Sequence, residues 1–288
     1  MISPRVFAAG ALLTNAFIFG VSWWFFRKLQ SYGLHPMWAT TFIYILALCI
    51  LQVLQPRAWR SLFSHPELIW LMVASGFTNI GFNWAVTTGD VVRVVLLFYL
   101  MPAWVVLVAW MVLGERPTVR AIGCLVLALV GIVIVLKTPT APWPVPESVA
   151  DWMALMGGLS FAVTNVLLRK NREVPQEAKL LGMFVGGGVM AALAATFGMW
   201  QGFVSELPQL DFVWLGWAVL VAIAFLFGNL ALQFGAARLS SSTTSLIMLF
   251  EVVFASGSSV VLGAGEMSLR TLLGATLILS ASLLSLAG

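Results

Sequence analysis

Runs of about twenty apolar residues, separated by short polar segments, follow one another along the whole chain. A helix of this length crosses the roughly 30 Å of hydrocarbon in a membrane. The pattern predicts ten membrane-spanning helices, at residues 6–26, 36–55, 68–88, 91–113, 118–136, 151–168, 179–200, 212–235, 241–262 and 269–286. The segment TPTAPWPVP at 138–146 separates the first five from the last five, and its prolines favour an extended, stiff connector. We therefore expect an all-α membrane protein of two five-helix halves.

The composition agrees with this class and argues against an enzyme. Apolar residues make up 61% of the chain and charged residues 9%, whereas a soluble domain has about 25% charged residues. The two cysteines, Cys49 and Cys124, fall inside apolar runs, so we expect no structural disulfide. The two histidines, His35 and His65, lie in or beside loops, and no Cys or acidic cluster accompanies them. Without a metal-ligand set or a phosphate-binding loop, we expect no catalysis, no metal, no cofactor and no ATP-driven step.

The second half of the chain repeats the first. The residues Leu100-Met101-Pro102 in span 4 correspond to Leu249-Phe250-Glu251 in span 9, and Gly114-Glu115 corresponds to Gly265-Glu266. Residues 19–23 in span 1 correspond to residues 161–165 in span 6, and Asn83 in span 3 corresponds to Asn229 in span 8. Because each half has an odd number of spans, the second half enters the membrane upside down, as in secondary transporters. We assign residues 1–137 and 151–288 to the two inverted repeats and 138–150 to the linker.

The distribution of positive charge predicts the orientation. With the N-terminus inside, ten Lys and Arg residues lie on the cytoplasmic side and five on the other. Positive residues are enriched in cytoplasmic loops, so both termini are expected in the cytoplasm.

These features resemble a known family. The ten spans, the proline in span 4 and the Leu-Gly-Glu-Arg-Pro segment at 113–117 resemble the EamA repeats of the drug/metabolite transporter superfamily. Within it the chain looks most like the YddG-type exporters of aromatic and other amino acids, a group of the bacterial inner membrane. This resemblance implies export by alternating access. The family pattern often has Glu-Pro in span 9, but Glu251 is followed by Val252 here, so the second proline kink is expected to be missing.

Polar residues at mid-span mark the candidate substrate site, because unsatisfied polar groups are costly in lipid. Ser75, Asn79 and Asn83 are spaced by four and share one face of span 3. The complete set of candidate substrate-binding residues is Trp23, Ser75, Asn79, Asn83, Tyr99, Thr164, Asn165, Asn229 and Met248. Any single Asn or Ser could equally join two helices without a transport role. We expect Ser75, Asn79 and Asn83 together to line a cavity, because three polar groups stacked on one helix face need water or substrate.

Two residues are candidates for gating or coupling. Pro102 removes an intrahelical hydrogen bond, frees the carbonyl of Phe98 and bends span 4, so we expect it to act as a hinge. Glu251 is the carboxylate deep in a span, where a charge must be paired or protonated. It could couple transport to protons or serve as a protonated gate residue. Arg93 is expected to pair with Asp90 on its own helix rather than to capture a substrate carboxylate.

Other features remain open at this stage. Trp23, Trp84 and Trp104 could form walls for an aromatic guest or pack in the core. The Gly182-xxx-Gly186 pattern is expected to pack within the chain, as in a monomer, although a dimer seam remains an alternative. The expected partners are the lipid bilayer and an amino-acid substrate, without nucleic acid. The competing functions are export of other metabolites or cationic drugs, and a membrane scaffold that transports nothing.

Overall fold

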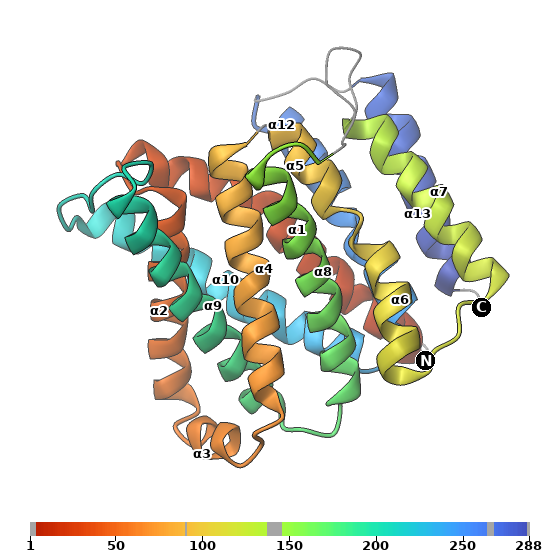
Figure 1. Ribbon diagram of the computed structural model, residues 1–288, viewed down its shortest axis with the longest axis horizontal. Helices are drawn as coiled ribbons and strands as arrows, with labels where there is room; N and C mark the ends of the chain where they lie inside the picture. Colours follow the sequence, from red (N-terminus) through yellow and green to blue (C-terminus); the bar gives the residue numbers. More distant parts are fainter. Residues whose placement is uncertain (1–3, 90, 137–145, 264–267, 287–288) are drawn as a thin grey trace.

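The chain folds into a bundle of helices. The computed structural model describes residues 4–89, 91–136, 146–263 and 268–286, and every regular element in these ranges is a helix (Figure 1). The first half contains α1 (Pro4–Ser31), α2 (Pro36–Leu54), α3 (Ala58–Phe63), α4 (Leu68–Thr88), α5 (Val91–Phe98), α6 (Met101–Leu113) and α7 (Val119–Leu136). The second half contains α8 (Val149–Lys170), α9 (Gln176–Trp200), α10 (Phe212–Ala236), α11 (Ser241–Met248), α12 (Phe250–Val261) and α13 (Leu269–Leu286).

The predicted membrane spans are present as helices. Within the described ranges, nine segments are long and apolar enough to cross a membrane, with α5–α6 and α11–α12 each counted once. The tenth span is α4, which is 21 residues long but carries Asn79 and Asn83 in its middle. Large apolar side chains such as Phe7, Trp110 and Leu283 are exposed on the outside of the bundle. A surface of this kind is suited to lipid, and the prediction of an all-α membrane protein with ten spans is confirmed.

The helix ends carry the residues that helix termini require. At the start of α8, the Ser148 hydroxyl accepts a hydrogen bond from the backbone N–H of Asp151, and the Asp151 carboxylate accepts one from the backbone N–H of Ser148. Ser240 caps α11 by accepting a hydrogen bond from the backbone N–H of Thr243. Gly114 ends α6 with φ of 70°, a left-handed conformation that glycine adopts without strain. These local signals explain why the spans begin and end where they do.

Helix contacts follow an approximate two-fold pattern. The helix α4 packs against α8 as α10 packs against α1, and α6 packs against α8 as α12 packs against α1. The pairs α2 with α9 and α7 with α13 join equivalent helices of the two halves. Figure 1 shows α7 and α13 side by side at one edge. This is the arrangement that two inverted five-helix repeats produce.

Glycines bring the two halves into close contact. A Cβ on Gly186 of α9 would lie 2.0 Å from the carbonyl oxygen of Met72 in α4, and the Gly182 position also faces Met72. The Gly182-xxx-Gly186 pattern therefore packs within the chain, as predicted. In the same way, α7 and α13 cross where Gly131 meets Gly274. Small residues let helix backbones approach in a membrane, where burial from lipid provides little driving force.

Both broken spans divide at equivalent positions. The first break lies at Tyr99 and Leu100, directly before Pro102, as predicted from the proline. The second lies at Leu249, so the span breaks there although the proline kink is missing, as expected from Val252 after Glu251. The Leu249 N–H bonds to the carbonyl of Leu246, three residues back, so a tightened turn separates α11 from α12 without proline.

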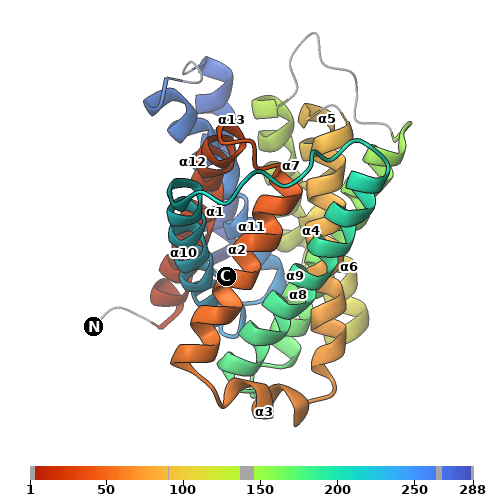
Figure 2. The same cartoon turned by 90° about the vertical axis from the view of Figure 1, so that its left-hand side faces the viewer.

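One short element was not predicted, and several predicted features lie outside the description. The helix α3 connects α2 to α4, with Ala58 and Leu62 buried and Phe63 exposed. Figure 2 shows it across the lower end of the bundle. The linker from 138 to 145, the Gly265-Glu266 echo and the Asp90 partner proposed for Arg93 lie outside the described residues.

Candidate functional site

A cavity of about 160 Å³ lies between the two halves of the molecule. Its walls come from α1, α2, α4 and α5 of the first half and from α8 to α12 of the second. Among the described lining residues, seven are phenylalanines, Glu251 is the one carboxylate, and Lys, Arg and His are absent. The cavity therefore combines aromatic walls with amides, hydroxyls and a single acidic group.

Seven of the sequence-predicted residues line this cavity. They are Ser75, Asn79, Asn83, Thr164, Asn229, Met248 and Glu251. The stripe on α4 lies there complete, and Asn83 and Asn229 reach the same cavity from equivalent helices of the two halves. The inverted repeat explains this convergence, because it presents matching faces of α4 and α10 to one central space.

Ser75, Asn79 and Asn83 on α4 also form hydrogen bonds to neighbouring helices, so part of their role is to join helices. Tyr44 on α2 donates a hydrogen bond to Asn79 Oδ1 over 3.0 Å, and Asn83 Nδ2 donates to Thr40 Oγ1 over 3.0 Å. Ser75 Oγ donates to the carbonyls of Met72 and, on α9, Met183. These residues therefore fix α2 and α9 against α4 while they face the cavity.

The remaining predicted residues do not line the cavity. Trp23 points from α1 to α12, where its Nε1 donates to Ser258 Oγ over 2.9 Å. Asn165 is 1% exposed and donates to the carbonyl of Phe161 on its own helix. Trp84 packs against Phe203, and Trp104 is likewise absent from the lining. The walls are therefore phenylalanines rather than tryptophans.

Tyr99 contacts the site through Glu251. Its hydroxyl lies close to the Glu251 carboxylate, and Tyr99 itself is 6% exposed and outside the lining. Tyr99 lies at the first helix break and Glu251 directly after the second. The pair thus links the two broken spans beside the cavity.

Pro102 is buried at the start of α6 and does not line the cavity. A helical proline leaves the carbonyl four residues earlier unbonded, which here is the carbonyl of Phe98. This carbonyl faces Gly158 of α8, where a Cβ would lie 2.6 Å from the oxygen. The freed carbonyl is therefore covered by protein.

The candidate set was incomplete. The mid-span polar residues Asn15 and Ser22 on α1 were left out of it, and Thr40 and Tyr44 on α2 were missed, yet all four line the cavity. A signal existed, because Thr40 and Tyr44 are four residues apart and Asn15 and Ser22 are seven apart, which places each pair on one helix face. The phenylalanines gave no such signal, because other phenylalanines, such as Phe17, face outward.

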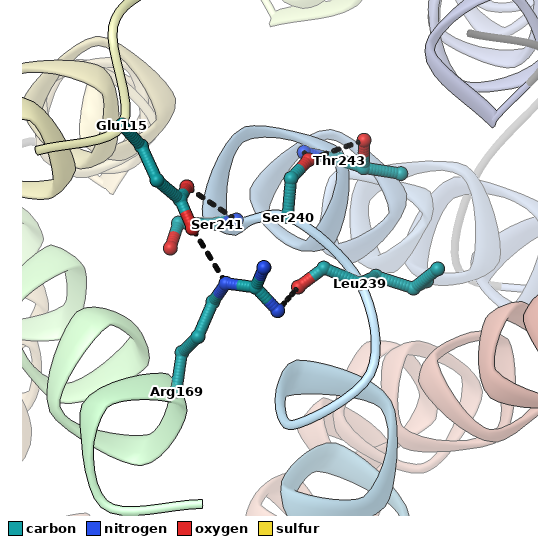
Figure 3. A network of polar contacts seen from close by, with 6 residues as sticks. All are labelled: Glu115, Arg169, Leu239, Ser240, Ser241 and Thr243. Atoms are coloured by element: carbon teal, nitrogen blue, oxygen red, sulfur yellow. Dashed lines mark hydrogen bonds and ion pairs between the residues drawn. The ribbon is translucent and has the colours of Figure 1, made fainter. Parts of the chain in front are cut away.

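Polar contacts tie several helices together at one end of the bundle (Figure 3). Glu115, just after α6, accepts hydrogen bonds from Arg169 Nε at the end of α8 and from the backbone N–H of Ser241 at the start of α11. Arg169 also donates to the carbonyl of Leu239, between α10 and α11. We call Glu115, Arg169, Leu239 and Ser241 the Glu115 cluster. It connects the turn between α6 and α7 to the end of α8 and to the connection between α10 and α11.

A second ionic cluster lies at the opposite end of the broken span. Arg93 near the start of α5 forms ion pairs with Glu147 and Asp151 at the start of α8, each over 3.0 Å. The side chain of Asp151 is 2% exposed. Arg93 therefore joins the two halves, through Glu147 just before α8 and Asp151 in its first turn.

Comparison with known proteins identifies the family of the first half. Residues 6–137 match the EamA-like transporter family. None of the curated proteins compared with the chain matches it. One solved structure, described as "Crystal structure of protein", is similar with a TM-score of 0.73 and 18% identity, over 96% of this chain and 95% of that one. Identity this low shows a shared fold alone. The first half of the chain is therefore similar to EamA-like transporters, and its long apolar helices make the chain a multi-pass membrane protein.

Proposed function

We propose that the protein is a secondary transporter that exports amino acids, aromatic and other neutral ones, across the bacterial inner membrane by alternating access. The cavity between the two halves supports this proposal most directly. Its phenylalanines suit an apolar or aromatic side chain, and its amides and hydroxyls suit the polar end of an amino acid. We assign substrate contacts to Ser75, Asn79, Asn83, Thr164, Asn229 and Met248.

The broken spans support alternating access. The breaks at Leu100 and Leu249 lie beside the cavity, next to Phe98, Met248 and Glu251, which line it. Each half-helix could move while its other half stays packed. We propose that both termini are cytoplasmic, as the distribution of Lys and Arg predicts. The Glu115 cluster would then close the cytoplasmic end of the cavity.

A second candidate substrate class is organic cations. Glu251 supports it, because this carboxylate lines the cavity and no basic residue is among the described lining residues. A cation would gain an opposite charge there, whereas a zwitterion would bring a carboxylate that finds no basic side chain.

Transport into liposomes tests the proposal. The purified protein is reconstituted, and counterflow of labelled phenylalanine and leucine is compared with counterflow of a labelled quaternary ammonium compound. Saturable amino-acid flux supports the first function, and flux of the cation alone supports the second. Measuring the same flux with and without a pH gradient then separates proton coupling from facilitated transport. If no compound is transported above empty liposomes, the proposed activity is wrong.

A further inference from the structure

The hydroxyl groups of the cavity are already used as donors. Five of them donate to a backbone carbonyl three or four residues earlier on their own helix, namely those of Ser22, Thr40, Ser75, Thr78 and Thr164. The hydroxyl of Tyr44 donates to Asn79 Oδ1. A hydroxyl has one proton and two lone pairs, so these groups retain chiefly acceptor capacity toward a guest.

The asparagine amides of the cavity also donate hydrogen bonds to the protein, and these bonds fix their orientation. Asn15, Asn79 and Asn229 donate through Nδ2 to the carbonyls of Gly228, Ser75 and Phe225. A backbone carbonyl can only accept, so each of these bonds determines which end of the amide is nitrogen. Asn83 Nδ2 donates to Thr40 Oγ1, whose own proton is directed to Pro36. At every amide in the lining, at least one N–H is therefore satisfied by the protein.

Asn15 has an oxygen that lacks a partner. The residue is 0% exposed and lines the cavity, and within the described part of the chain its Oδ1 accepts no hydrogen bond. Leaving a buried acceptor unsatisfied costs about 1–3 kcal/mol, so a donor from a guest would recover that cost. Its Nδ2 bond to Gly228 places Asn15 beside Asn229, the next residue on α10.

Glu251 is brought close to the same helix. On α1, a Cβ at Gly20 would lie 2.7 Å from the backbone oxygen of Glu251, so α12 contacts α1 directly at this point. Ser22, two residues further on α1, lines the cavity together with Glu251. The helices α1, α10 and α12 thus present an unsatisfied amide oxygen, a second amide and a carboxylate to one space.

We propose that Asn15, Asn229 and Glu251 form a subsite for the ammonium group of the substrate, and that the described lining offers no cationic side chain to its carboxylate. This inference rests on the proposed transport through the cavity and specifies which end of the substrate is recognised. An ammonium group has only donors, which match the carboxylate, the amide oxygens and the hydroxyl lone pairs of the lining. A carboxylate has only acceptors, and among the described lining residues it meets no cationic donor. A primary amine with an aromatic body should therefore bind at least as tightly as the corresponding amino acid.

Three ligands with the same ring test this inference on the full-length protein. Binding of 2-phenylethylamine, phenylalanine and 3-phenylpropionate is measured by calorimetry in lipid nanodiscs. We expect the amine to bind as tightly as phenylalanine or more tightly, and the carboxylate compound to bind at least tenfold more weakly. If 3-phenylpropionate bound as well as phenylalanine and the amine did not bind, the subsite would be refuted while amino-acid transport remained. If none of the three bound, both the subsite and the proposed function would be wrong.

A matched pair of variants tests the role of the carboxylate. Glu251→Gln keeps the shape and removes the charge, so amine affinity should fall about ten- to a hundredfold. Binding of 3-phenylpropionate should be unchanged or improved, which a general loss of structure would not produce. The control Glu173→Gln makes the same change at a side chain that is 88% exposed and should leave all three affinities unchanged. Equal losses for all three ligands in Glu251→Gln would contradict the assignment.

Discussion

We expect Glu115→Gln to open the end of the cavity that the Glu115 cluster closes. The carboxylate accepts from Arg169 Nε and from the backbone N–H of Ser241, so it connects α6 to α8 and α11. Glutamine retains the shape and one acceptor oxygen but loses the charge. The contact between the two halves should therefore weaken without leaving a hole.

The magnitude follows from the exposure of the pair. The side chains of Arg169 and Glu115 are 24% and 26% exposed, so solvent screens part of their attraction. Bonds to charged groups are worth about 1.5–3 kcal/mol when buried, and a partly exposed network is worth less, about 1 kcal/mol. If the cluster is broken when this end opens, losing about 1 kcal/mol raises the open fraction roughly fivefold.

Thiol accessibility measures this change. A reporter is introduced as Ser22→Cys in the cavity, in a background carrying Cys49→Ser and Cys124→Ala. A membrane-impermeant thiol reagent is applied from the side of Glu115 in oriented vesicles, and the labelling rate should rise about fivefold in Glu115→Gln. The matched control is Glu173→Gln, whose ion pair with Arg172 is highly exposed. Equal labelling rates in the two variants would show that the Glu115 cluster does not control access.

Three further predictions concern the break in span 4 and the cavity. Pro102→Ala restores a donor for the Phe98 carbonyl and should stiffen the helix, so turnover in liposomes should slow while thermal stability holds; turnover at the native rate would show that the proline has only a static role. Asn83→Ala and Asn229→Ala should each weaken apparent substrate affinity about five- to a hundredfold, with transport at Asn83 falling first. A lower melting temperature with normal transport by the remaining protein would instead identify these asparagines as helix-joining residues. Gly158→Ala places a Cβ 2.6 Å from the Phe98 carbonyl oxygen and should lower the free energy of unfolding by about 1–3 kcal/mol. The control Gly123→Ala has open space around it and should not lower the free energy of unfolding. Equal stability of the two variants would contradict the close contact.

The sequence by itself determined the class, the spans and one of the two breaks. These are local properties, because a helix in lipid needs about twenty apolar residues and must satisfy its backbone within itself. The proline signal was equally local and correctly located the break before Pro102. The polar stripe on α4 was readable too, since a spacing of four places Ser75, Asn79 and Asn83 on one face.

Only the tertiary structure decided which polar groups face the cavity and which join helices. Trp23 and Asn165 looked as suitable as Asn229, yet one bonds to Ser258 and the other lies outside the lining. Lipid and an aromatic cavity both select apolar side chains, so the hydrophobic pattern of a span does not distinguish its two apolar environments.

The break at Leu249 and the Glu115 cluster also required the folded structure. The first uses a tightened turn that needs no special residue, and the second joins Glu115 to Arg169, 54 positions apart in the sequence. The lone oxygen of Asn15 is likewise a product of packing, because its amide nitrogen bonds to Gly228 on a helix of the other half. Such contacts depend on how closely helices approach, which glycines and neighbouring side chains set together and no single stretch of sequence specifies.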